Sequence, residues 1–144
     1  MSEQTIKLVA AGVLLVHGLG HGGALAALAW IRLRPGTPTG GWLAARSWLL
    51  PSLTADTATT LASAFWMVSL VGFVIAAMSF WGVVIPGSVW RPLGVASALA
   101  SIAGITLFFG TWPMFNTFAA LAVNVAVLAA VLWLRWPSEA VLGS

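Results

Sequence analysis

The stretches of this chain without a charged side chain constrain its fold most. Three such runs cover residues 8–31, 57–90 and 92–134, with lengths of 24, 34 and 43 residues. A helix needs about 20 apolar residues to cross the hydrocarbon core of a bilayer. Only 6% of the 144 residues are charged and 60% are hydrophobic, too few polar groups to cover a water-soluble domain. The sequence therefore predicts an integral protein of the lipid bilayer.

The three runs divide into four predicted spans. Pro86-Gly87 interrupts the second run. The third run is about twice as long as one crossing needs, and Thr111-Trp112-Pro113 is where it would turn, because proline lacks a donor and restricts the residue before it. The predicted fold is all-α, a polytopic transmembrane four-helix bundle forming one domain over residues 1–144. Its spans cover about residues 8–31, 58–84, 93–109 and 113–134.

The first span is predicted to be a true span and not a secretory signal peptide. The segment before it, MSEQTIK, has one acid and one base, which makes a poor positively charged n-region. Between the first two spans, residues 32–57 open with the loop-forming sequence RLRPGTPTGG. The WLAARSWLL stretch that follows is predicted to be either a short helix in the interface plane, with Trp42, Ala45 and Leu49 on one side, or a hydrophobic loop.

The composition also restricts the classes of partner that we expect this protein to bind. The net charge of +3 rests on six scattered basic residues, with no cluster to follow a phosphate backbone, so we expect no nucleic-acid binding. The chain has no cysteine and hence no thiolate nucleophile or thiolate metal ligand. The expected partners are the lipid bilayer and either further copies, in a homo-oligomer, or the other subunits of a larger membrane complex.

Two spans carry small residues at helical spacing, which lets helix backbones approach closely. In the first span, Gly18 and Gly22 form a GxxxG pattern, and Gly12, Gly20 and Gly23 widen the small surface. In the third span, the small residues are Gly94, Ser97, Ser101 and Gly104. Both faces are predicted to contact other helices, either inside one bundle or between protomers.

Two histidines stand out in the first span, within the sequence LVHGLGHGG. His17 and His21 are four residues apart, so they lie on one helical face near the middle of the span. An ionisable group at that depth is costly and usually has a partner inside the bundle. Asn124, near the middle of the fourth span, is the predicted partner. Further candidates lie in all three of the other spans: Thr59, Ser63, Ser69 and Ser79 in the second, Ser97, Ser101 and Thr106 in the third, and Asn116 and Thr117 in the fourth.

Three interpretations of the histidines follow. In the first, they only hydrogen-bond to neighbouring helices and set their register. In the second, His17, His21 and Asn124 bind a ligand or cofactor, which could be haem, a chlorophyll-type pigment, a quinone or a lipid headgroup. The two histidines are also the only candidate metal ligands, although a closed zinc site needs four. In the third, the protein is a small membrane enzyme or a proton-coupled carrier that uses the same histidines.

The segment VLLVHGLGHGG resembles the first span of a loose group of small bacterial four-span membrane proteins, which carry a motif of the type HGLxHxxG there. The resemblance rests on His17, Gly18, Leu19 and His21, together with Asn124. The chain is also similar in size and hydropathy to the DoxX-like four-span proteins. This resemblance implies a multi-pass protein of the bacterial inner (plasma) membrane. It implies no reaction, because the group has no agreed activity.

Overall fold

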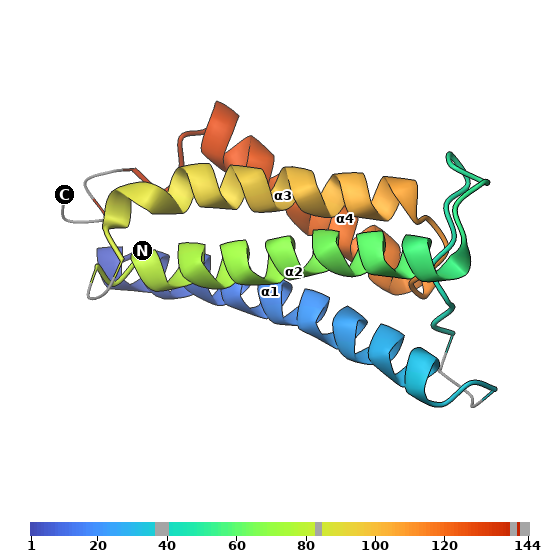
Figure 1. Ribbon diagram of the computed structural model, residues 1–144. Coiled ribbons are helices and arrows are strands. Elements are labelled where there is room, and N and C mark those ends of the chain that lie inside the picture. The colour runs from blue at the N-terminus through green and yellow to red at the C-terminus, as the bar shows by residue number, and fades with distance from the viewer. Residues whose placement is uncertain (37–40, 83–84, 139–140, 142–144) are drawn as a thin grey trace.

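The protein is an all-helical bundle. The computed structural model describes residues 1–36, 41–82, 85–138 and 141. Four helices run up and down through the bundle, with the N-terminus and the α2–α3 connection at one end and the loop before α2 at the other (Figure 1). They are α1 (Glu3–Leu33), α2 (Ala55–Ser79), α3 (Trp90–Leu107) and α4 (Met114–Leu128). The described residues contain no strand, and the predicted fold class is confirmed.

Each of the four helical segments is long and apolar enough to span a membrane. The third candidate span includes the short 3-10 helix η1 (Gly87–Val89), and the fourth continues from α4 into the π-helical turn η2 (Ala129–Trp133). Large apolar side chains such as Val16, Leu19 and Phe118 are exposed on the outside of the bundle, where hydrocarbon would surround them. The protein is therefore a multi-pass membrane protein whose helices contact the lipid bilayer.

The helix ends differ from the predicted spans by a few residues. α2 ends at Ser79, before the predicted limit at residue 84, because the chain turns at Gly82, which has a positive φ of 63°. Positions 83–84 lie outside the described residues. α3 starts at Trp90, three residues before the prediction, because Pro92 lies in the first helical turn, where a missing N–H breaks no intrahelical bond.

Of the two predicted alternatives for the segment between the first two spans, the structure has the loop and not the interfacial helix. Residues 42–47 have no regular secondary structure, and the loop packs against the end of the bundle. The amide of Leu43 donates to the carbonyl of Thr111 (3.2 Å), and Trp48 Nε1 donates to the carbonyl of Thr106 (2.6 Å). Ala45 is fully buried beneath these contacts. The segment therefore donates hydrogen bonds to the end of α3 and to the α3–α4 turn, and it forms no helix of its own.

The small residues of α3 lie on its buried face, where they contact neighbouring helices of the same chain. A Cβ added at Gly104 would lie 2.8 Å from Cβ of Phe65 in α2, and one added at Gly94 would approach Val127 in α4. In α1, Gly18 lies against Phe73 of α2 in the same way. Close approach at these glycines brings α2 against both α1 and α3.

Three glycines of α1 do not contact another described helix of the same chain, and the predicted alternative of a contact between protomers stays a prediction. A Cβ added at Gly12, Gly20 or Gly23 would meet no atom of the described residues within 4 Å. Gly20 and Gly23 are exposed, and Gly12 is half-buried beside a cavity that Ala77 and Met78 of α2 also line. They leave open space beside α1 instead of a helix contact.

Helix pairing leaves one side of the bundle open. α1 packs along α2, α2 along α3, and α3 along α4, but no comparable pairing joins α1 to α4 within the described residues. Two apolar core clusters fill the two ends of the bundle, one around Phe73 and Phe80 and the other around Trp66 and Trp112. Between the clusters, at mid-depth, lies a set of polar side chains.

Candidate functional site

The two histidines occupy different environments on α1. The buried stripe of this helix repeats at three- and four-residue steps and includes Leu14, Gly18 and His21, so His21 is fully enclosed. His17 lies at the edge of that stripe and is only half-buried. The ring centroids of His17 and His21 are 5.1 Å apart. One histidine therefore belongs to the core, and the other faces the open side of the bundle.

A chain of three hydrogen bonds links the histidines through two other helices. His17 Nε2 lies 2.8 Å from Asn124 Oδ1. Asn124 Nδ2 donates to Ser101 Oγ at 2.7 Å, and Ser101 Oγ lies 3.1 Å from His21 Nε2. The structure thus brings the three predicted residues together and adds Ser101, which the sequence indicated only as one of several candidate partners.

This network joins α1, α3 and α4 near the middle of the bundle. α1 has 31 residues and is therefore about 46 Å long, against a hydrocarbon thickness of about 30 Å. His17 is the fifteenth residue of that helix, close to its midpoint. Asn124 and Ser101 are fully buried, and burial in a dry environment strengthens the requirement that each polar group has a partner.

The His21 end of the network lies among aromatic rings. The ring of Phe73 is parallel to the imidazole within 6°, with centroids 6.2 Å apart, and the centroid of Trp112 is 5.2 Å away. His21 Nδ1 is buried and has no hydrogen-bond partner among the described residues. The hydrogen-bond chain therefore ends in the apolar core at this side.

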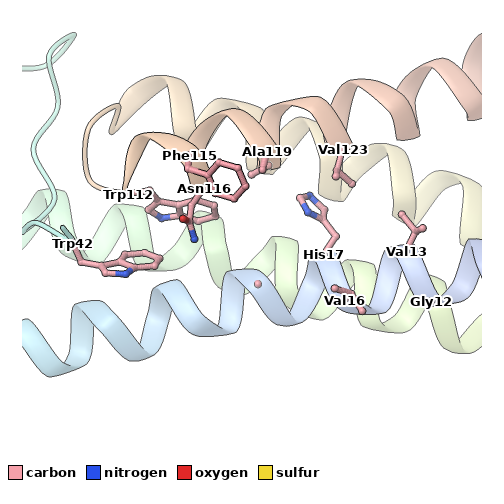
Figure 2. Close-up of a pocket in the computed structure, with 12 residues that line it drawn as sticks. Gly12, Val13, Val16, His17, Trp42, Trp112, Phe115, Asn116, Ala119 and Val123 are labelled. Carbon is pink, nitrogen blue, oxygen red and sulfur yellow. The ribbon is translucent and has the colours of Figure 1, made fainter. Parts of the chain in front are cut away.

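The His17 end opens into a groove between α1 and α4 with a volume of about 520 Å³. Figure 2 shows the His17 ring rising from α1 toward α4, with Trp112 and Phe115 on one side and Val13 and Val123 on the other. The groove is lined by Gly12, Val13, Val16, His17, Gly20, Trp42, Trp112, Phe115, Asn116, Ala119, Ala120 and Val123. Its wall is mainly apolar, with His17 and Asn116 as the polar side chains and no charged one.

Glycines on α1 and aromatic rings at one end shape this groove. Gly12 and Gly20 line it, and the space beside them is where larger side chains would project. Trp42, from the loop before α2, lies with its ring centroid 5.8 Å from that of Trp112 and closes one end. Sequence reasoning missed Trp42 and Phe115, because no local pattern shows that the loop and the start of α4 meet beside α1.

The apolar surface continues beyond the groove along the same side of the bundle. A second cavity of about 220 Å³ shares Val13 and Val123 with the groove and extends past Trp90 to Trp136. A long apolar molecule can therefore lie along the α1–α4 side with one end beside His17.

The nitrogen atoms of the histidines limit which cofactors fit. Nε2 of His17 and Nε2 of His21 are both held in hydrogen bonds within the protein. Axial coordination of haem or of a chlorophyll-type pigment through either Nε2 would break one of these bonds, so Nδ1 of His17 is the imidazole nitrogen in the groove wall that remains for it. Across the part of the chain that the structure describes, no three His, Cys, Asp or Glu side chains come together as a metal site. The donor set suits a hydrogen-bonded organic ligand better than a coordinated metal.

Comparison of the chain with known protein families, with curated proteins and with solved structures finds no match. We therefore infer the function of the protein from the geometry of the groove and of the hydrogen-bond network.

Proposed function

We propose that this protein is a small membrane protein that binds a lipid-soluble organic ligand in the α1–α4 groove, with the polar head of the ligand beside His17. The observation that carries the proposal is the position of His17. It is a half-buried imidazole at mid-depth, in the wall of an apolar groove that opens between two helices. Polar groups at this depth are costly and are usually functional.

A role in helix register alone explains only part of this arrangement. The bond between His17 and Asn124 would hold α1 and α4 in register whether or not a groove lay beside it. The groove itself depends on Gly12 and Gly20, which contact no neighbouring helix. Ligand sites are typically concave, mostly apolar and equipped with a few placed polar groups, as this groove is.

The size and chemistry of the groove favour a quinone-type or other lipid-like head with an apolar tail. The groove wall carries no charged side chain, so the head is uncharged and hydrogen-bonding. Trp42, Trp112 and Phe115 supply aromatic faces against which a flat ring can pack. The second cavity gives a tail an apolar path along the same side of the bundle.

The alternative of a small enzyme or a proton-coupled carrier uses the same histidines, but it needs a proton path that reaches beyond them. In the described parts of the chain, the hydrogen bonds lead from the groove to His21 and end there. We therefore favour ligand binding. The protein would work as an accessory subunit, either as a homo-oligomer or within a larger complex, in the bacterial inner (plasma) membrane that the resemblance of its first span implies.

Lipid retention by two matched glycine variants tests the proposal. Gly20 and Gly23 both lie on α1 with open space beside them, but only Gly20 lines the groove. Wild type, Gly20→Leu and Gly23→Leu are purified in the same mild detergent, extracted with organic solvent and compared by mass spectrometry. We expect one lipid-soluble compound to remain with wild type and Gly23→Leu and to be lost from Gly20→Leu. Equal retention by all three folded proteins would overturn the proposal.

A further inference from the structure

The orientation of the Asn124 side chain determines which nitrogen of His17 carries a proton. Asn124 Nδ2 donates to Ser101 Oγ, so Oδ1 is the Asn124 atom that faces His17 Nε2. A carbonyl oxygen only accepts hydrogen bonds, and His17 Nε2 is therefore the donor. In a neutral imidazole, the lone pair then lies on Nδ1.

The neutral form of His17 follows from its surroundings. Among the described residues, the acidic side chains are Glu3 and Asp56, which lie in the first turns of α1 and α2; Glu139 lies outside the described residues. In the described part of the chain, no carboxylate is therefore placed to balance a positive charge at mid-depth, where such a charge is costly.

The free nitrogen of His17 is available to the groove. Nδ1 of His17 has no hydrogen-bond partner among the described residues, and unlike Nδ1 of His21 it is not sealed inside the protein. The His17 ring stands in the groove wall (Figure 2). The groove therefore offers a hydrogen-bond acceptor at the place where the head of a ligand would lie.

We propose that the groove selects a ligand whose head is an aromatic hydroxyl, as in a phenol or a quinol, and that this hydroxyl donates to His17 Nδ1. This inference rests on the proposed function, which it makes more specific. A quinone or another ketone presents only acceptor oxygens, and an acceptor facing the lone pair of Nδ1 gains no hydrogen bond. The aromatic rings of Trp42, Trp112 and Phe115 favour a flat head over an aliphatic alcohol.

Two probes that differ in one hydrogen-bond donor test this selectivity. 4-Dodecylphenol and its methyl ether share a ring and a tail, but only the phenol has an O–H to donate. Their affinities are measured by calorimetric titration into nanodiscs that contain wild type, His17→Leu or Gly20→Leu. Taking the phenol-to-ether affinity ratio in each protein and comparing the ratios removes the difference in bilayer partitioning between the probes.

We expect the phenol-to-ether ratio to be about 3- to 10-fold higher in wild type than in His17→Leu, the value of one net hydrogen bond. Equal affinity ratios in wild type and His17→Leu, together with loss of binding of both probes in Gly20→Leu, would overturn the hydroxyl preference. The groove would then remain a binding site without that preference. Binding of neither probe to wild type, or binding unaffected by Gly20→Leu, would overturn the proposed function itself.

A measurement on unmodified protein decides the proton position even if His17→Leu does not fold. The chain has only two histidines, so side-chain ¹⁵N NMR gives two imidazole signatures, which His21→Gln assigns. We expect His17 to show a protonated Nε2 and an unprotonated Nδ1. A protonated Nδ1 in wild type would overturn the inference, because the groove would then present a donor.

Discussion

His17 on α1 and Asn124 on α4 are linked by a 2.8 Å hydrogen bond across the side of the bundle where these two helices do not pack together. The two residues are 107 positions apart in the sequence. His17 lines the groove, and the second bond of Asn124, to Ser101, connects this link to the core. A polar link therefore joins α1 to α4 beside the groove, where the two helices lack close packing along their length.

The importance of this link can be measured with Asn124→Leu. The substitution removes two hydrogen bonds and leaves buried polar atoms of Ser101 and His17 without that partner. We expect the free energy of unfolding to fall by about 1–3 kcal/mol. Reversible unfolding in mixed detergent micelles gives this value. Asn116→Leu is the control, because its amide is exposed in the groove wall; equal stability of Asn124→Leu and wild type would contradict the prediction.

Because α3 approaches α2 closely at Gly104, we expect even a methyl side chain there to destabilise the protein. A methyl group there would lie 2.8 Å from Cβ of Phe65, which belongs to a neighbouring helix and cannot rotate away. We expect Gly104→Ala to lower the free energy of unfolding by about 1–3 kcal/mol through overpacking. Gly23→Ala adds the same group in open space and should not destabilise the protein, because alanine is more favourable than glycine in a helix interior by up to about 1 kcal/mol. A similar loss in both variants would point away from helix contact as the cause.

The loop before α2 should open more often when the hydrogen bond of Trp48 to α3 is removed. Trp48 Nε1 donates to the carbonyl of Thr106, and Trp48→Phe keeps an aromatic ring but removes the donor. A net hydrogen bond of about 1 kcal/mol corresponds to about a fivefold rise in the open population. We therefore expect limited proteolysis of residues 41–54 to become about five times faster. Trp133→Phe, at a side chain that is 85% exposed, is the control and should leave the cleavage rate unchanged.

The up-and-down course of the helices predicts which segments share a membrane face. The N-terminus and the α2–α3 connection lie at one end of the bundle, and the loop before α2 lies at the other (Figure 1). Ser2, Ser88 and Ser52 belong to these three segments, in that order. All three are exposed, and the chain has no cysteine, so Ser2→Cys, Ser88→Cys and Ser52→Cys each introduce a single thiol. We expect an impermeant maleimide to label the first two from the same side of oriented vesicles and Ser52→Cys from the opposite side. Labelling of Ser2→Cys and Ser52→Cys from one side would contradict the four-span topology.

The sequence predicted the candidate site in outline and missed its shape. A helical period of 3.6 places His17 and His21 on one face, and polarity at mid-depth indicated Asn124 as a partner. The small residues of the third span were also predicted to contact other helices, which they do within this bundle. In the first span, Gly18 packs against α2, whereas Gly12 and Gly20 border open space within the chain, because spacing alone does not say whether a neighbour is present; a contact between protomers there stays a prediction.

By itself, the amino-acid order determined that this chain is a membrane protein of four helices, because hydrocarbon forces each segment to satisfy its own backbone groups, and that demand is local. Tertiary structure alone decided that α1 and α4 stand apart, that Trp42 from the loop closes one end of the groove, and that His21 is sealed while His17 is open. These features depend on contacts between segments far apart along the chain. The sequence of one helix determines which of its side chains share a face. It does not determine which other helix that face will contact.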